Sequence, residues 1–575
     1  MKTTATWSLR GMFFGKVETV TWYTQIDAII KDTFDVSLGN FGGELTLCAA
    51  IVLILLARLF MGEPRKCGCR SFGLCCDMLR KGDGVSLAIT AIGFLIAIRL
   101  QHPFGMGLDE AQLIAKPIFT GLLVQDGLTR FLRPLLLVFG LLYTLWLART
   151  KLLNTENASD YCVMILGAMI GMCLMVSANH MLMVFLGMEM ASVPCYALAA
   201  FRKDHRPGAE SALKYAVFGA ASAGTMLYGI SLLCGTLGSA ELPVMGARMA
   251  EIFVNGCSFT TAFLLAMGSV LMTAGLAFKL SAVPFQFWVP DVFEGASAEV
   301  ACFLSIASKA AAIGLTLRIL IGLLNVDPSS LPAFTPESIA MAMAPARKFA
   351  VILISLLAVI TCTYGNLAAY TQTHLQRLLG YSTIAHAGYM LMPMAAIPVV
   401  LGTASQTQIF VALGYYLVAY LFMNFVAFIV TAMIRDTRGS EEITAARGLG
   451  RRSPGIAVCF VIALFSLVGI PPLAGFAGKF LAFLAVWRAG LIVVVVIGLV
   501  NSLISLFYYL RVVKAAVVDP VPQGEDETVT VPTIPALDGS GLLCVAMTFM
   551  VVLLGLWWDG GLMQLLARTA QYTLR

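Results

Sequence analysis

Charged residues are scarce in this chain. Asp, Glu, Lys and Arg make up only 12% of its 575 residues, whereas a soluble globular protein carries about 25%. Hydrophobic residues reach 59%, and a soluble domain of that composition could not cover its surface with polar groups. The same apolar content excludes a disordered chain, and 14 cysteines are too few for a disulfide scaffold of this length. The composition therefore indicates a polytopic membrane protein.

Motifs for nucleotide and redox cofactors are also lacking. The sequence has no Rossmann GxGxxG motif, no P-loop and no ferredoxin-type run of cysteines. We therefore expect this chain itself to bind no NADH, flavin, iron–sulfur cluster or other cofactor. The stretch KCGCRSFGLCC holds Cys67, Cys69, Cys75 and Cys76 without a paired CxxC motif or a nearby His. Free cytoplasmic thiols are the favoured interpretation, and a metal site is the alternative.

Long apolar runs predict fourteen transmembrane helices, because about 18 or more apolar residues can span a bilayer as a helix. Runs such as LIVVVVIGLV do not alternate between apolar and polar residues, as a transmembrane β-strand would. The predicted fold class is an all-α polytopic membrane protein. The predicted spans are 45–61, 84–100, 131–148, 161–178, 181–200, 210–235, 262–285, 297–322, 348–368, 377–397, 408–434, 456–485, 489–511 and 541–558.

Lysine and arginine concentrate in the odd-numbered loops between these spans. By the positive-inside rule these loops are cytoplasmic, and the even number of helices then places both termini outside. The net charge of +6 reflects this bias and says nothing about nucleic acid. The residues concerned are Arg65, Lys66, Arg70, Arg80 and Lys81 in loop 1–2, Arg202, Lys203 and Arg206 in loop 5–6, and Arg435, Arg438, Arg447, Arg451 and Arg452 in loop 11–12.

The remaining segments flank the helices. Residues 1–44 are predicted to be an N-terminal extension outside the membrane, in part an interfacial helix. Residues 45–150 hold helices 1–3, and 515–540 are a polar surface loop. Residues 541–575 form helix 14 and a C-terminal tail.

A few ionisable residues lie within the predicted spans, where a charge costs about 2.5–3.5 kcal/mol. Most membrane charges, such as Arg58, Arg99, Arg133 and Arg511, lie at span ends and are expected to snorkel to the interface. For any single mid-span residue, a structural ion pair or a wrongly set span boundary is an equally good interpretation. For the whole set, function is favoured. The set is Glu189 in helix 5, Lys214 in helix 6, Lys279 in helix 7, Lys309 in helix 8, His386 in helix 10 and Lys479 in helix 12.

The chemistry of this set favours proton transfer. Burial disfavours the charged form of a lysine, and a nearby carboxylate favours it again. Moving Glu189 toward or away from a lysine would therefore switch that lysine between holding and releasing a proton. Neighbouring lysines disfavour each other's charge, so adjacent sites can pass a proton along. We predict a relay in which Lys279 and Lys309 are central, Glu189 modulates them and Lys479 is the terminal site toward the outer side.

Prolines interrupt two of the spans close to these lysines. Pro284 follows Lys279 by five residues, and Pro471 and Pro472 precede Lys479. Proline removes a backbone donor, and unpaired backbone at membrane depth is tolerated only inside protein or beside a water-filled cavity. Broken helices at matching positions of two halves are typical of inverted-repeat transporters. The expected repeats are helices 4–8 (160–322) and helices 9–13 (348–511), with helices 7 and 12 broken.

Six motifs follow one another between about 160 and 510: LGMEMASVP, ESALKYAVFGAASAGTMLYGISLLCG, AFKLSAVPFQFWVPDVFEGA, ASKAAAIGL, RLLGYSTIAHAGYML and GIPPLAGFAGKF. In order and spacing they resemble the subunit N family of respiratory complex I, the proton-translocating NADH:quinone oxidoreductase. The resemblance implies a fourteen-helix antiporter-like subunit. It also assigns the family's functional carboxylate and lysines to Glu189, Lys214, Lys279, Lys309 and Lys479.

The resemblance further implies proton pumping driven by electron transfer from NADH to quinone in other subunits. NADH, FMN, iron–sulfur clusters and quinone would belong to those partners. The partners would include further antiporter-like subunits and small helical subunits, in a bacterial inner membrane. A subunit of a multi-subunit sodium/proton antiporter or of a membrane-bound hydrogenase is the alternative, and a membrane scaffold with a degenerate channel is a third interpretation.

Two positions depart from the family pattern. Gln286 stands where the family often has His, which puts one relay member in doubt. Glu299 stands where the family often has Pro. Two interpretations of Glu299 stay open: an added acidic group near a half-channel mouth, and an interfacial residue.

Overall fold

Membrane-spanning helices dominate the computed structural model, which describes residues 22–61, 82–101, 114–150, 152, 158–202, 206–403, 405–520 and 539–573. Within these residues, twelve helices are long and apolar enough to cross a membrane. Two shorter apolar helices, Gly84–Leu100 and Pro454–Val468, account for the other two predicted spans. The predicted all-α polytopic fold is confirmed. Cys67, Cys69, Cys75 and Cys76 lie outside the described residues.

The helices that match the fourteen predicted spans begin and end within several residues of the predicted limits, apart from the two interrupted spans and the longer α10, α16 and α18. In chain order they are α3 (Gly42–Met61), α5 (Gly82–Leu100), α7 (Gly127–Leu147), α8 (Ala158–Ser177), α9 (Met181–Ala199), α10 (Arg206–Leu237), α12 (Phe259–Leu280), α14 with α15 (Ala298–Phe303 and Lys309–Leu324), α16 (Pro336–Ala369), α17 (Leu375–Val400), α18 (Ser405–Arg438), α20 with α21 (Pro454–Val468 and Ala474–Arg488), α22 (Ile492–Val517) and α23 (Gly539–Leu556).

Shorter elements complete the structure at the ends of these helices. A two-stranded antiparallel hairpin, β1 (Lys116–Ile118) and β2 (Leu123–Gln125), stands where the sequence predicted only a loop. The other short helices are α1 (Trp22–Lys31), α2 (Leu38–Asn40), α11 (Leu242–Val254), α13 (Trp288–Gly295), α19 (Leu449–Arg452) and α24 (Gly561–Gln571). Further single turns are Asp32–Ser37, Pro328–Ser330 and Ile443–Ala446.

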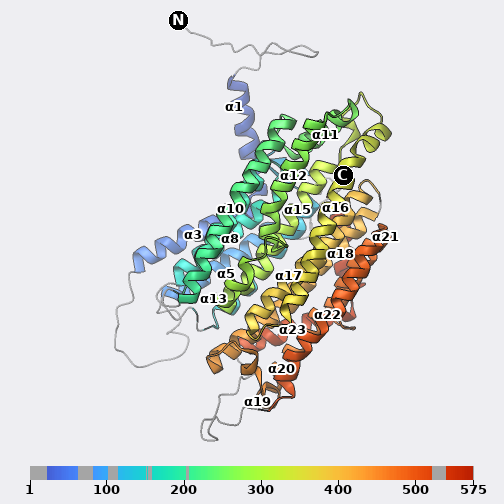
Figure 1. Cartoon of the computed structure of the whole chain (residues 1–575). Coiled ribbons are helices and arrows are strands. Elements are labelled where there is room, and N and C mark those ends of the chain that lie inside the picture. Colours follow the sequence, from blue (N-terminus) through green and yellow to red (C-terminus); the bar gives the residue numbers. More distant parts are fainter. Residues whose placement is uncertain are drawn as a thin grey trace.

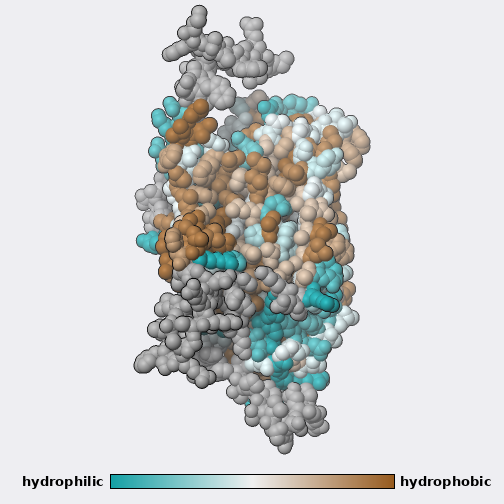
Figure 2. All heavy atoms as spheres, turned by 90° about the vertical axis from the view of Figure 1, so that its left-hand side faces the viewer, coloured by the Kyte–Doolittle hydropathy of each residue, from teal (hydrophilic) through white to brown (hydrophobic). Residues whose placement is uncertain are grey.

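The long helices lie side by side with a common tilt, and the first and second halves of the chain occupy opposite sides of the bundle (Figure 1). Helices α1 and α11 lie at one end, which we call the α11 end, together with the C-terminus. Helices α13 and α19 lie at the other, the α13 end. Figure 2 shows a broad apolar belt between more hydrophilic ends, as expected of a protein surrounded by lipid.

Three helices form the centre of the bundle. The most apolar stretch of Ala298–Leu324 is 100% buried, and the corresponding stretches of α17 and α18 are each 94% buried. By contrast, Gly42–Phe60 is only 28% buried and faces outward. Side chains on α15, α17 and α18 are therefore shielded from lipid by the other helices.

Two helices are interrupted where the prolines predicted. Helix α12 ends at Leu280, and Ser281 takes a left-handed conformation with φ 64° before the cis Val283–Pro284 bond. Helix α20 ends at Val468, and Gly469 takes φ 92° before the cis Pro471–Pro472 bond. Proline lacks the N–H that would continue the helical ladder. The breaks in helices 7 and 12 are confirmed, and the repeat relation between 160–322 and 348–511 stays a prediction.

Candidate proton path

Lys279 lies on the last turn of α12, immediately before the break, and only 2% of it is exposed. Its Nζ donates to the Ser192 hydroxyl of α9 at 2.9 Å. Glu189 lies one turn earlier on α9, is half-buried, and interacts electrostatically with Lys279. Helix α9 carries both Glu189 and Ser192, and its position is fixed by close packing against α8. At Gly187 of α9 the two backbones are so close that a Cβ would be 2.9 Å from the Met175 nitrogen.

Lys309 is the first residue of α15 and follows a π-helical turn, Leu304–Ser308. Such turns are frequent at functional sites. Only 2% of Lys309 is exposed, and its ammonium donates to the Thr383 carbonyl of α17. Thr383 also meets Ser305 through their hydroxyls at 2.9 Å. Lys309 thus lies at one end of a series of hydroxyl groups.

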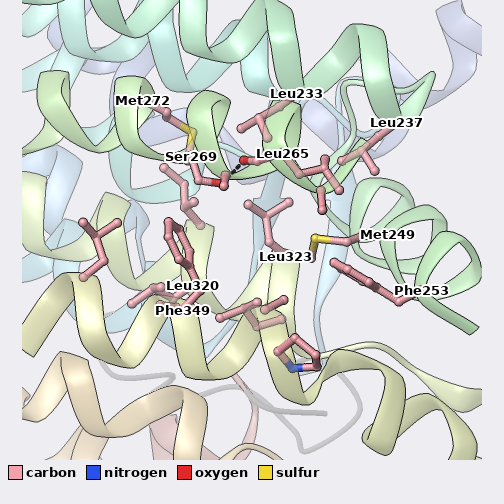
Figure 3. Close-up of a pocket in the computed structure, with 18 of the residues that line it drawn as sticks. Leu233, Leu237, Met249, Phe253, Leu265, Ser269, Met272, Leu320, Leu323 and Phe349 are labelled. Atoms are coloured by element: carbon pink, nitrogen blue, oxygen red, sulfur yellow. Dashed lines mark hydrogen bonds between the residues drawn. The ribbon is translucent and has the colours of Figure 1, made fainter. Parts of the chain in front are cut away.

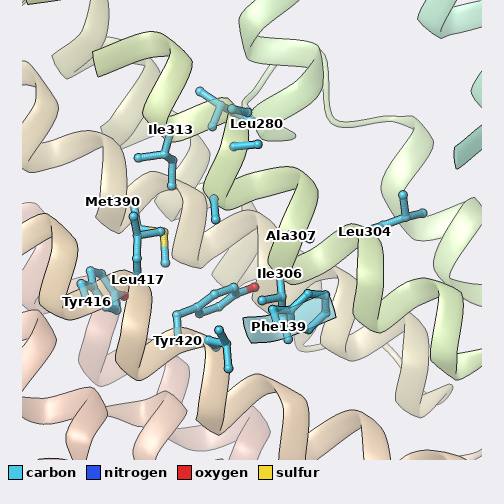
Figure 4. Close-up of a cluster of buried hydrophobic side chains, with 14 of the residues drawn as sticks. Phe139, Leu280, Leu304, Ile306, Ala307, Ile313, Met390, Tyr416, Leu417 and Tyr420 are labelled. Carbon is cyan, nitrogen blue, oxygen red and sulfur yellow. The ribbon is translucent and has the colours of Figure 1, made fainter. Parts of the chain in front are cut away.

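Tyrosines of α18 continue this series toward His386. Ser305 and the Tyr420 hydroxyl are 2.8 Å apart, and the amide of Asn424 donates to both. Figure 4 shows Tyr416 and Tyr420 projecting from α18 into the packed centre of the bundle, with Tyr420 near Ile306. The Tyr416 hydroxyl lies 2.8 Å from His386 Nδ1.

His386 lies between two lysines. Its electrostatic neighbours include Lys479 and Lys309, and its ring centroid is 5.2 Å from that of Tyr420 and 5.7 Å from that of Tyr389. The Lys479 Nζ lies 4.5 Å from the Tyr389 ring centroid, a cation–π distance. Lys309, His386 and Lys479 are therefore brought together by one cluster of hydroxyls and aromatic rings.

The broken helix 12 holds the Lys479 ammonium directly. Lys479 donates to the carbonyls of Leu467 and Val468 at 2.9 and 2.8 Å. These carbonyls end α20, so they have no partner within the helix and lie at the negative end of its dipole. Ser502 of α22 lies 3.4 Å from the same Nζ. The break therefore creates a site that holds the Lys479 ammonium among the central helices.

The path has a gap between Lys279 and Lys309. Among the described residues, no side-chain hydrogen bond joins the Lys279–Ser192 pair to the Lys309 network. Two buried polar atoms on segments next to these lysines lack a protein partner in the described chain: the Ser308 hydroxyl, next to Lys309, and Gln286 Oε1, just after the α12 break. Such atoms are usually satisfied by ordered water. Gln286, the departure from the family pattern, is 97% buried, and its amide cannot replace a histidine as a proton carrier.

Lys214 does not join the path, contrary to its predicted mid-span position. It lies in the third turn of α10 with its side chain 41% exposed. It pairs with Glu210 at 2.8 Å and with Asp291 of α13 at 3.0 Å. Helix α10 begins at Arg206, so Lys214 lies near the α13 end of the bundle, where such pairing costs little.

The surroundings of Glu299 decide against one of the two interpretations that the sequence left open, and the other, an acidic group near a half-channel mouth, stays a prediction. The side chain is fully buried and accepts two hydrogen bonds from Arg435, at 2.9 and 3.0 Å. Helix α18 extends to Arg438, four residues past the predicted span, and this brings Arg435 onto Glu299. The interfacial interpretation is wrong because no part of the Glu299 side chain reaches the surface.

Two further buried ion pairs were missed by the sequence. Arg133 is not at an interface: its side chain is 0% exposed and lies 3.0 Å from Glu44 of α3. Arg318 of α15 forms a two-pronged pair with Asp126, the residue that caps α7. Both arginines lie in spans that looked apolar, and their carboxylates are 89 and 192 residues away along the chain.

An apolar cavity of about 250 Å³ lies apart from this path (Figure 3). It is lined by side chains of α10, α11, α12, α15 and α16, and among the described residues that line it Ser269 is the only polar one. No residue of the lysine path contributes to it. Within the described residues there is also no cluster of three or more His, Cys, Asp or Glu side chains that could hold a metal ion.

Comparison with known families identifies the class of this bundle. Residues 178–505 match the family model of the NADH:quinone oxidoreductase/Mrp antiporter transmembrane domain. The chain belongs to this family. The match covers the region that holds Glu189, Lys279, Lys309, His386 and Lys479.

Curated relatives extend the match over most of the chain. It is 35% identical to the NADH-quinone oxidoreductase subunit N of an Anaeromyxobacter species over 77% of this chain and 84% of the relative. It is 33% identical to subunit N 2 of Sorangium cellulosum over 91% of this chain and 95% of the relative.

Solved structures share the fold. A chain of Thermus thermophilus respiratory complex I with bound aureothin is 29% identical, with a TM-score of 0.67 over 90% of this chain and 98% of that one. A chain of the Mrp complex from a Dietzia species is 16% identical, with a TM-score of 0.69 over 94% of this chain and 98% of that one, and this likeness shows the fold alone.

Proposed function

We propose that this chain is the antiporter-like subunit N of a proton-translocating NADH:quinone oxidoreductase. The observation that carries the proposal is the buried set Lys279, Lys309, His386 and Lys479 within one bundle. A charge in this environment costs several kcal/mol, so ionisable residues there are usually either paired or functional. None of the four is paired with a carboxylate in a salt bridge of 4 Å or less among the described residues, so a structural ion-pair role does not account for them.

In the proposed mechanism, protons move between these groups and the subunit holds no redox chemistry. Glu189 lies on the half-buried face of α9 and favours the charged form of Lys279 when near it. Moving Glu189 away releases the proton toward Lys309. The hydroxyls of Thr383, Ser305 and Tyr420 then lead to His386 and Lys479, where the ends of α20 hold the ammonium.

The assembly and location follow from the same proposal. NADH, FMN, iron–sulfur clusters and quinone lie in partner subunits, and further antiporter-like and small helical subunits adjoin this one in a bacterial inner membrane. The odd-numbered loops, and so the α13 end, face the cytoplasm. Residues 160–322 and 348–511 are the two inverted repeats. Co-purification of NADH-oxidising and quinone-binding subunits supports this assignment, whereas a native complex without them supports the antiporter or hydrogenase alternative.

The direct functional test replaces Lys279 or Glu189 by Ala in the assembled complex. NADH-driven proton pumping is measured in vesicles, with Lys514→Ala as the control, since Lys514 is an exposed lysine at the end of α22. We expect both path variants to lose pumping and the control to retain it. Unchanged pumping in both path variants would contradict the proposal.

A further inference from the structure

A second group of titratable side chains lies at the α13 end, outside the lysine path. At its centre, Arg435 binds two carboxylates at once. Its Nη1 and Nη2 donate to the fully buried Glu299 at 3.0 and 2.9 Å. Its Nε and Nη2 donate to Asp436 at 2.9 and 2.8 Å, and the Asp436 side chain is 23% exposed. The guanidinium thus already has a second partner if it leaves Glu299.

Glu441 and His374 form the outer part of this group. Glu441 Oε2 lies 3.4 Å from His374 Nε2, and both side chains are partly exposed. The loop that carries Glu441 is fixed to the start of α17 by two backbone hydrogen bonds, Leu375 N to Glu441 O at 2.8 Å and Ile443 N to Thr373 O at 2.9 Å. The Glu441–His374 pair is therefore held in place at the α13 end of the bundle.

Burial shifts the pKa of both members of the outer pair toward the neutral form of each side chain. Burial raises the pKa of the Glu441 carboxyl to about 7, against the lowering effect of nearby arginines. Burial also lowers the pKa of His374. The charged groups that face Glu441 from the adjoining elements are Arg435, Arg202, Glu299 and Asp436, and those that face His374 are Glu294, Arg377 and Glu442.

The three central helices link this group to the lysine path. Glu299 precedes Lys309 by ten residues along α14 and α15, a rise of about 15 Å. His374 directly precedes α17, which carries Thr383 and His386. Arg435 lies on the last turn of α18, which carries Tyr416 and Tyr420.

Buried hydroxyls occupy the space beyond Glu299. The hydroxyls of Tyr143 and Tyr161 are 2.7 Å apart and completely buried, and both tyrosines interact electrostatically with Glu299. Ser305 lies further along the same helix and already belongs to the Lys309 network. Buried hydroxyls therefore lie near Glu299 and, six residues further along the helix, in the Lys309 network.

We propose that this group is a proton-binding intake port, in which Glu441 with His374 takes up protons, Glu299 accepts them when Arg435 lets go of it and stays on Asp436 alone, and Glu299 passes them inward when Arg435 returns. The proposal rests on the proposed pumping function. A single proton moves from the Glu441 carboxyl to the Glu299 carboxylate, and no electron is transferred. Without Arg435, a carboxylate as buried as Glu299 takes up a proton, because an unpaired buried charge is costly. When Arg435 returns, it favours the carboxylate and the proton is released toward Lys309.

The test measures the initial rate of NADH-driven proton pumping against pH in vesicles holding the assembled complex. Glu441→Gln and Glu299→Gln are compared with Glu337→Gln, an exposed glutamate at the other end of the bundle. In the wild type and the control, pumping is expected to fall as the pH rises through about 7, because Glu441 loses its proton there. In Glu441→Gln the fall in pumping near pH 7 is expected to disappear. In Glu299→Gln pumping is expected to be slower at every pH.

Two more variants distinguish a structural role of Glu299 in assembly from a role in proton transport. Glu299→Asp keeps the carboxylate and is expected to restore part of the rate. If Glu299→Gln fails to assemble, Glu299→Ala combined with Arg435→Met removes both charges and is expected to assemble while pumping slowly.

Lys309→Ala distinguishes failure of the port from failure of the pumping function. If Glu441→Gln keeps the wild-type profile and the Glu299 variants keep the wild-type rate while Lys309→Ala abolishes pumping, the port is wrong and the pumping function stands. A wild-type rate that is flat through pH 7 also overturns the port. Wild-type pumping in Lys309→Ala as well would overturn both.

Discussion

The pair between Asp126 and Arg318 ties the start of α7 to the middle of the chain, and its removal should destabilise the bundle. Arg318 donates to the two Asp126 oxygens at 2.7 and 2.8 Å, and also to Thr129 and the Val176 carbonyl. Asp126→Asn leaves the guanidinium without a counter-charge. The helix cap is retained, because Asn caps a helix about as well as Asp, so the change reports the lost charge.

The expected cost can be set from the surroundings of the pair. Breaking a buried pair by removing one partner costs about 3–5 kcal/mol. Asp126 and Arg318 also line a cavity of about 480 Å³, and water there would solvate part of the freed charge. We therefore expect the lower limit, about 3 kcal/mol, which is about two orders of magnitude in the unfolding equilibrium constant.

The assay is unfolding of the purified subunit in mixed micelles with increasing SDS, followed by tryptophan fluorescence. Asp160→Asn is the matched control, since Asp160 is 36% exposed and pairs with Arg58 at the surface. We expect a loss below about 1 kcal/mol for this control. Asp126→Asn combined with Arg318→Met should recover much of the stability. A cost for Asp126→Asn no larger than that of Asp160→Asn would refute the reasoning.

Two further predictions concern the terminal lysine and the histidine. Gly469→Ala should impair pumping, because φ is 92° there and the new Cβ would lie 3.1 Å from Lys479 Cδ. Gly490→Ala, with φ 81° and open space around it, carries the same backbone strain without that contact and should pump normally. Tyr416→Phe removes the hydroxyl that contacts His386 at 2.8 Å and should slow proton transfer measured in vesicles without lowering the amount of assembled complex. Equal pumping by the two glycine variants, or a wild-type rate in Tyr416→Phe, would contradict these roles.

The sequence predicted the scaffold well because each relevant signal is local. Long apolar runs identify spans, and prolines identify breaks, so α12 and α20 end where Pro284 and Pro471 require. Low overall charge also made buried lysines visible. Lys279, Lys309 and Lys479 are each at least 97% buried, in agreement with their predicted depth.

Pairing between distant segments could not be predicted in the same way. The Arg133 side chain is satisfied by Glu44, which lies 89 residues earlier at the start of a different helix. Arg435 was placed in a loop, and only the extra turn of α18 brings it to Glu299. Lys214 was placed in mid-span, and its pairing with Glu210 and with Asp291 of another helix, which holds it at the α13 end, is not visible from the limits of the span. An uncertain span end led to the wrong placement of Arg435, and unseen partners led to that of Lys214.

The most direct test of the central claim is the number of protons moved per NADH oxidised. The ratio is measured in vesicles that contain complex with Lys279→Ala, Glu189→Ala or Lys514→Ala. For Lys279→Ala and Glu189→Ala the account predicts either fewer protons moved per NADH oxidised or the loss of NADH oxidation coupled to proton pumping. For Lys514→Ala it predicts the wild-type ratio. The wild-type ratio at the wild-type rate of NADH oxidation in both Lys279→Ala and Glu189→Ala would contradict it.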